Sequence, residues 1–163
     1  HGVSVRGLMR MHQFNKVEQV IFCRPEESSK LLKYMLGLSE KFFQSLDIPY
    51  RVVEMCSGEL GAKLARQWDI EAWFPRQNEY KEVTSAGSCT DYQAIALNIK
   101  YLDKKNEKKY VHILNNTMVA TSRALVAILE NHQQKDYTVK GPKVLVKYMN
   151  GRKFIGKRDT KKS

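Results

Sequence analysis

The sequence predicts an α+β fold in which one antiparallel sheet is flanked by helices. Short runs rich in β-branched and aromatic residues recur along the chain, and two long segments carry apolar residues at helical spacing. The strand-like runs do not alternate strictly with helices, which favours antiparallel pairing. The 163 residues, 42% of them hydrophobic, suffice for one core. We therefore expect one domain.

The first expected strand and helix follow one another directly. Residues 17–23 have the β-branched and aromatic composition of a strand, and Arg24-Pro25 ends it. Pro25 followed by two glutamates is typical of a helix N-terminus, where the helix dipole favours carboxylates. Apolar side chains then recur at helical spacing as far as Leu46, so this helix is expected to pack on the core.

Further strands and a second long helix are expected in the rest of the chain. The helix is expected from Thr117 to His132, with Asn115 or Asn116 as its cap. The composition of a strand is found at residues 50–56, 70–74, 80–85 and 110–114.

Two polar stretches separate or follow these elements. Residues 102–109 are expected to form a hairpin turn. Residues 150–163 are basic and poor in apolar side chains, which predicts a flexible tail behind a folded region at residues 1–149. Basic residues at a terminus are either solvated or in contact with RNA, and the sequence leaves both open.

The charge of the chain favours a polyanionic partner. The formal net charge is +11 and the isoelectric point is near 9.6. Clustered lysine and arginine side chains release counterions from a phosphate backbone, which makes nucleic acid the natural partner. A basic chain that gains only solubility from its charge is the alternative.

Three cysteines, Cys23, Cys56 and Cys89, show neither a disulfide framework nor the paired spacing of a zinc site. A reducing compartment is therefore expected. No run approaches the roughly 18 apolar residues that a membrane span needs, so no membrane partner is expected.

The opening run contains three residues of different chemistry at intervals of four positions. Arg10 can neutralise phosphate oxygens, Phe14 can stack on a base, and Glu18 can accept a hydrogen bond from a hydroxyl or an amine. Taken singly, an arginine is more simply explained by a surface ion pair and Phe14 by core packing. Together they predict a site for a nucleotide and a small amine.

The same run resembles motif 2 of class II aminoacyl-tRNA synthetases in its seryl version. The pattern Arg-Gly-Leu-x-Arg-x-His-Gln-Phe-x-Lys-Val-Glu is matched at residues 6–18. Four further stretches match in the same order, at residues 57–61, 69–75, 80–85 and 115–123. The resemblance is greatest to bacterial and organellar seryl-tRNA synthetases. It implies the class II fold, with this chain as the C-terminal part of the catalytic domain.

The resemblance implies an ATP site with Mg²⁺ as a cofactor. Arg10 corresponds to the residue on the α-phosphate and Arg123, in motif 3, to the residue on the far phosphates. Phe14 corresponds to the ring that stacks on adenine. Glu82 and Ser85 correspond to ATP-binding residues that share the magnesium ion, whereas Glu82 considered alone is better explained by a solvated strand end.

The resemblance also implies the substrates. Glu18 and Thr117 correspond to the residues that recognise the hydroxyl of serine, and Asn115 would support that pocket. The implied reaction is activation of serine with ATP to seryl-adenylate, followed by transfer to tRNA(Ser). The implied assembly is a homodimer, or a heterodimer with another synthetase subunit. The mitochondrial matrix is the expected compartment, with the cytoplasm as the alternative.

Two departures from the family pattern leave a second function open. The sequence from His1 onward does not include the Phe-Arg-x-Glu segment, whose arginine the resemblance implies as the residue that holds the amino-acid carboxylate. The usual Gln-Ala-Arg-Arg is Gln93-Ala94-Ile95-Ala96, which replaces two cations by apolar side chains. The alternative is a non-catalytic paralogue that serves as a binding or scaffolding module in an RNA-rich assembly.

Overall fold

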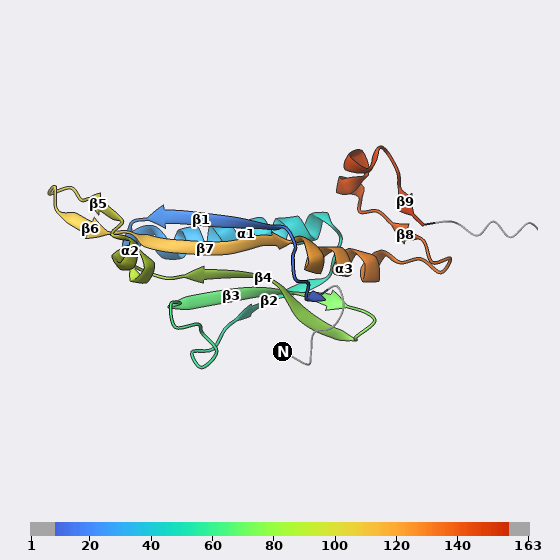
Figure 1. Ribbon diagram of the computed structural model, residues 1–163, viewed down its shortest axis with the longest axis horizontal. Helices are drawn as coiled ribbons and strands as arrows, with labels where there is room; N and C mark the ends of the chain where they lie inside the picture. The colour runs from blue at the N-terminus through green and yellow to red at the C-terminus, as the bar shows by residue number, and fades with distance from the viewer. Residues whose placement is uncertain (1–8, 157–163) are drawn as a thin grey trace, which may run out of the picture.

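The computed structural model of the chain describes residues 9–156, and its centre is a five-stranded antiparallel sheet (Figure 1). The strand order is β1-β7-β4-β3-β2, so the first strand in the chain is an edge strand next to the last long one. The strands are β1 (Lys16–Cys23), β2 (Tyr50–Glu54), β3 (Arg66–Phe74), β4 (Glu79–Ser88) and β7 (His112–Ala120).

Two helices, α1 (Ser28–Ser45) and α3 (Thr121–His132), cover one face of this sheet. The side chains between them and the strands form the main core, in which Phe43, Phe74 and Ile70 are fully buried. In β3 the alternate residues from Trp68 to Phe74 point into this core. The residues between them therefore point to the opposite, open face. The predicted fold class, a sheet flanked by helices, is confirmed.

The first predicted strand and helix are confirmed nearly to the residue. After β1, a single 3₁₀ turn, η2 (Pro25–Glu27), leads into α1, and Asp47 ends the helix in the left-handed conformation at φ 55°. Leu32, Met35 and Phe43 lie on its buried face. Of the described helices, none is long and apolar enough to span a membrane.

The predicted start of the second long helix is wrong. Residues 117–120 extend strand β7, and α3 begins at Thr121, so neither Asn115 nor Asn116 caps it. Asn116 is fully buried instead, where its amide donates to Gln19 Oε1 at 2.7 Å and to Ser39 Oγ at 2.8 Å. Strand pairing with β1 along the whole of β7 outweighs the local capping preference.

Residues 100–110 form the predicted hairpin, in which β5 (Lys100–Leu102) pairs with β6 (Lys108–Tyr110). The Asp103 carboxylate holds the turn, because its Oδ1 accepts from the amides of Lys105 and Glu107 at 2.8 and 2.9 Å. A short helix that the sequence analysis did not predict, α2 (Tyr92–Leu97), precedes the hairpin.

The last described residues form a unit of their own beside the end of α3 (Figure 1). Strand β8 (Val139–Lys140) pairs with β9 (Phe154–Ile155), and the 3₁₀ helix η3 (Lys143–Met149) joins them. We call residues 139–156 the C-terminal unit. Within the predicted tail at residues 150–163, Phe154 and Ile155 form strand β9, and residues 157–163 lie outside the described part of the chain.

Replacing Gly37 with alanine is expected to stabilise the protein by about 0.5–1 kcal/mol. Gly37 lies in the middle of α1, and an added Cβ would meet nothing within 4 Å. The gain comes from helix propensity alone, and the measurement is the shift in thermal midpoint. Gly58→Ala is the control, since its added Cβ also meets nothing but the residue lies in a turn. A lower midpoint for the Gly37 variant would contradict the prediction.

Candidate active site on the open face of the sheet

A pocket of about 540 Å³ lies on the open face of the sheet, opposite the helices. Strands β1, β4 and β7 supply most of its lining, and the loop between β2 and β3 supplies Lys63 and Leu64. Four of the predicted site residues line this pocket, namely Glu18, Ser85, Asn115 and Thr117.

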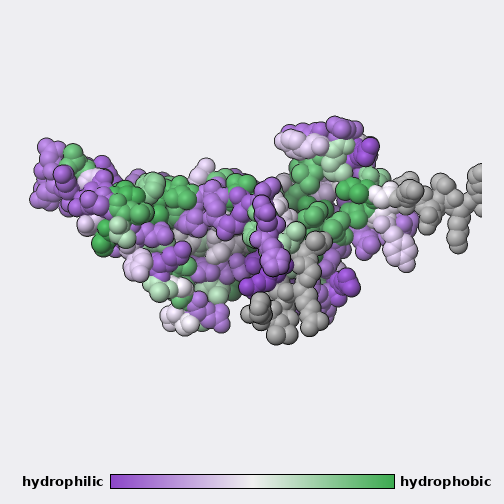
Figure 2. All heavy atoms as spheres, in the orientation of Figure 1, coloured by the Kyte–Doolittle hydropathy of each residue, from purple (hydrophilic) through white to green (hydrophobic). Residues whose placement is uncertain are grey.

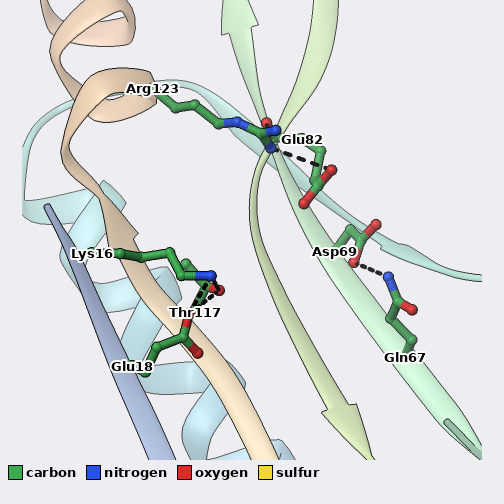
Figure 3. Close-up of polar contacts among 7 residues, drawn as sticks. All are labelled: Lys16, Glu18, Gln67, Asp69, Glu82, Thr117 and Arg123. Carbon is green, nitrogen blue, oxygen red and sulfur yellow. Dashed lines mark hydrogen bonds and ion pairs between the residues drawn. The ribbon is translucent and has the colours of Figure 1, made fainter. Parts of the chain in front are cut away.

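Glu18, Asn115 and Thr117 form one hydrogen-bonded cluster. Figure 3 shows Glu18 and Thr117 of this cluster together with Lys16. Glu18 is the cross-strand partner of Thr117, whose hydroxyl donates to Glu18 Oε1 at 2.9 Å. Asn115, two residues earlier on the same face of β7, donates to Glu18 Oε2 at 2.9 Å. Lys16 Nζ lies 2.5 Å from Glu18 Oε1. The cluster is a preformed polar pocket around one carboxylate.

The surroundings of Glu18 keep it ionised. Desolvation by partial burial acts to raise the pKa of its carboxyl. The hydrogen bonds from Lys16, Asn115 and Thr117, with the charge of Lys16, outweigh that effect and lower the pKa below its ordinary value. At neutral pH the site therefore presents a negative charge that can bind an ammonium group or accept a hydrogen bond from a hydroxyl.

Arg123 of α3 forms an ion pair with Glu82 of β4 (Figure 3). Arg123 lies in the first turn of α3, and its Nη1 contacts the Glu82 backbone oxygen at 2.9 Å and carboxylate Oε2 at 3.3 Å. Both side chains are partly exposed, at 32% and 46%. The surface ion pair expected for an arginine considered by itself is thus present. It holds the guanidinium at Glu82, in the first half of β4.

A β-bulge brings Glu82 and Ser85 to one face of β4. Residues three apart on a regular strand point to opposite faces. Here Glu82 pairs with Glu71 and Ser85 pairs with Asp69, so the buried Val83 is an extra residue without a partner of its own. Since residues 69 and 71 share the open face of β3, their partners on β4 share it as well.

Arg10 and Phe14 lie in the loop that precedes β1, and both are exposed. Phe14 is 46% exposed, so the interpretation of this ring as an ordinary core aromatic is wrong. Asn15 at the end of the loop accepts from the Thr121 amide and hydroxyl at 3.0 and 2.8 Å. The loop is thereby fastened to the helix turn that carries Arg123, although the structure shows no contact between the two arginines within the described residues.

Sequence reasoning missed four polar residues that line the pocket, namely Lys16, Lys63, Gln67 and Gln93. Lys16 pairs with Glu18, and Gln67 donates to the buried Asp69 at 2.8 Å. The signal for Lys16 was available, because residues two apart on a strand share a face.

The apolar pair that replaces two cations does not line the pocket. Ile95 is 52% exposed and Ala96 is also exposed, while Gln93 at the start of the same helix α2 does line it. The change of charge at these positions therefore leaves the lining of the pocket unaltered.

The chain belongs to the family of class II tRNA synthetase core domains (G, H, P, S and T), whose model matches residues 1–132. Its antiparallel sheet with flanking helices is the fold of that family.

Proteins similar to this chain are serine–tRNA ligases. The enzyme of Methanocella arvoryzae is 52% identical over 95% of the chain, and that of Dictyoglomus thermophilum is 56% identical over 91%. These matches span 37% and 35% of the two relatives, so the chain corresponds to about a third of their length.

Two solved structures are similar over nearly the whole chain. Seryl-tRNA synthetase from Pyrococcus horikoshii, complexed with ATP, has a TM-score of 0.90 at 53% identity, covering 94% of this chain and 34% of that one. Cytoplasmic serine–tRNA ligase from Naegleria fowleri, in complex with AMP, has a TM-score of 0.89 at 44% identity, covering 98% and 38%.

Proposed function

We propose that the whole protein is a serine–tRNA ligase, which activates serine with ATP and transfers it to tRNA(Ser). The observation that carries the proposal is the arrangement on the open face, where the Glu18 cluster lies in the same sheet face as the Arg123–Glu82 pair. The Glu18 cluster suits the amino and hydroxyl groups of a small amino acid, and the Arg123 guanidinium suits phosphates. The similarity to serine–tRNA ligases supports the same assignment.

In the first step, a carboxylate oxygen of serine attacks the α-phosphorus of ATP, and the bond to pyrophosphate breaks. The site has to neutralise charge and align two reactants, so positioning and electrostatics carry most of the catalysis. Arg10 would bind the α-phosphate and Arg123 the far phosphates, because a guanidinium stays charged and binds phosphate oxygens through two parallel hydrogen bonds. The exposed ring of Phe14 would stack on adenine.

The serine subsite rests on Glu18 and Thr117, with Asn115 as their support. The Glu18 carboxylate would accept a hydrogen bond from the ammonium or hydroxyl group of serine, and the Thr117 hydroxyl would complete the pocket. A site that hydrogen-bonds a substrate hydroxyl rejects analogues without one, because its own polar groups are then left unpaired. The lowered pKa of Glu18 supports this role, since the residue stays charged.

Mg²⁺ fits the oxygen donors at the other end of the site. Glu82 offers a carboxylate that is partly exposed, and the bulge at Val83 places the Ser85 hydroxyl on the same face. Within the described residues no group of three carboxylate, histidine or cysteine side chains could hold a metal, which suits an ion bound mostly through water and substrate phosphates. When bound, the ion would supply neutralisation of phosphate charge.

The second step, transfer to tRNA, requires the terminal ribose hydroxyl of tRNA(Ser) to attack the carbonyl carbon of the adenylate, with AMP as the leaving group.

We also propose the assembly and compartment expected from the sequence. The assembly is a homodimer or a heterodimer with a synthetase subunit, and the compartment is the mitochondrial matrix or the cytoplasm. The non-catalytic alternative has less support, because Ile95 and Ala96 lie outside the pocket lining.

Serine-dependent exchange of pyrophosphate into ATP tests the proposal on the whole protein, with threonine and cysteine as controls. Exchange that requires serine would support the ligase. Silence from a folded, full-length protein would overturn it and leave a synthetase fold that acts as a binding module.

Gly87→Ala is expected to raise the KM for serine by about tenfold or more. Gly87 lines the pocket, and an added Cβ would lie 2.7 Å from Leu64 Cδ2, which is the far end of a flexible side chain in the same lining. The leucine must therefore shift, and the added methyl group itself takes up space in the lining of the pocket. Gly61→Ala is a matched control, because its Cβ would meet the same leucine at 3.9 Å. Equal KM values for both variants would contradict the prediction.

A further inference from the structure

The C-terminal unit carries an unusual excess of positive charge. Residues 139–156 contain no aspartate or glutamate, and their cations are Lys140, Lys143, Lys147, Arg152 and Lys153. Every one of these side chains is exposed, and none appears in an ion pair within the described residues 9–156. In Figure 2 the upper edge of the unit is hydrophilic, and hydrophobic residues lie below it.

Three of these cations meet at one cavity. Lys140, Lys143 and Lys153 line a pocket of about 570 Å³ between the unit and the ends of α1 and α3. The pairing of β8 with β9 and the bond from the Gly141 amide to the Lys153 oxygen, at 2.9 Å, bring them together. Asp47 is the one carboxylate in the described lining, so the cavity keeps a net positive charge.

An aromatic ring lies in the wall between this cavity and a second one. Phe154 lines the lysine cavity and also a neighbouring pocket of about 590 Å³, to which Arg152 contributes. The ring is 37% exposed. A cationic groove with an exposed ring is the arrangement by which proteins hold single-stranded nucleic acid, with phosphates on the cations and a base on the ring.

We propose that the C-terminal unit binds RNA, with phosphates held by Lys140, Lys143 and Lys153 and an unpaired base stacked on Phe154. The inference rests on the proposed function in that the RNA is taken to be the tRNA substrate. The surface is separate from the active site, because Arg123 lies in the first turn of α3 and the cavity lies at its last residue, His132, roughly 14 Å along the helix at 1.5 Å per residue.

The test measures binding of a fluorescein-labelled tRNA(Ser) transcript to the whole protein and to the triple variant K140Q/K143Q/K153Q. The variant is expected to bind about tenfold more weakly at 0.1 M salt, and the slope of log K against log salt is expected to fall by about 2. The matched control is K104Q/K105Q/K108Q in the β5–β6 hairpin, which removes the same charge elsewhere and is expected to bind like the wild type. Phe154→Leu keeps an apolar side chain without a stacking face, and it is expected to weaken binding several-fold.

Three results would overturn the proposal. They are an unchanged affinity in the triple variant or in Phe154→Leu, an equal loss in the hairpin control, and displacement of the RNA by polyglutamate of equal charge, which would indicate an acidic protein partner. Serine-dependent pyrophosphate exchange at the wild-type rate shows that the variants fold. If the wild type itself lacks exchange, the ligase proposal fails. Thermal melts then show whether the variants fold, and the RNA-binding result still tests the proposal for the C-terminal unit.

Discussion

Replacing Arg123 with alanine is expected to lower serine-dependent ATP–pyrophosphate exchange by about 10²–10³-fold, the usual cost of removing one donor aimed at developing charge. Arg123 is positioned for this role by Glu82, which holds its guanidinium through the backbone oxygen and the carboxylate. Arg123→Lys is expected to recover part of the loss, because an ammonium group keeps the charge but lacks the planar fork.

Arg66→Ala is the matched control for Arg123. Arg66 also makes one ion pair with a glutamate, Glu54, at 2.8 Å, and its guanidinium lies over the Trp68 ring, away from the pocket lining. Its exchange rate is expected to stay within about twofold of wild type, since exposed ion pairs contribute little. Comparable losses in both variants would show that Arg123 acts through folding, and no loss in either would remove it from the phosphate site.

Replacing Glu18 with glutamine is expected to raise the KM for serine by about 100-fold. Glutamine has the same shape but loses the negative charge that Lys16, Asn115 and Thr117 now stabilise, and a hydrogen bond to a charged group contributes about 1.5–3 kcal/mol. Discrimination between serine and alanine should fall by a similar factor, because it depends on the same acceptor. Both quantities are read from exchange kinetics.

Glu71→Gln separates this effect from a general loss of charge. Glu71 lies on the same open face, paired with Arg51 at 2.6 Å, and does not line the pocket. Its variant is expected to keep the serine KM of the wild type. An unchanged KM in the Glu18 variant, or an equal rise in the Glu71 variant, would contradict the assignment of Glu18 to the serine subsite.

The elements with long, unambiguous patterns could be predicted from the sequence. Strand β1 and helix α1 follow from a β-branched run and a helical apolar stripe, each bounded by a clear stop signal. The start of α3 could not be predicted in this way. Asn115 and Asn116 look like caps, yet both lie in a strand because pairing with β1 and β4 extends it. Two-residue strands such as β8 and β9 have no local signal at all.

Some residues of the site could likewise be predicted from the sequence, and others could not. The family pattern places Glu18, Asn115 and Thr117 together, and the strand register explains why. Lys16 and Gln67 share a strand face with partners two residues away, so spacing could have indicated them. The position of the β2–β3 loop against the pocket comes from tertiary packing, which spacing alone cannot supply. The roles of Arg10 and Phe14 stay predictions, since their partners would be substrate groups.

The extra residue at Val83 separates strand β4 into two parts, and the alternation of side chains in the first part is independent of that in the second. From Thr84 onward the residues that face the core follow one alternation, and before Val83 they follow the opposite one. Deleting a single residue between Glu79 and Val83 would move Glu82 off the open face while leaving Ser85 there. The position of Glu82 beside Arg123 therefore depends on the length of this strand as much as on the side chain at residue 82.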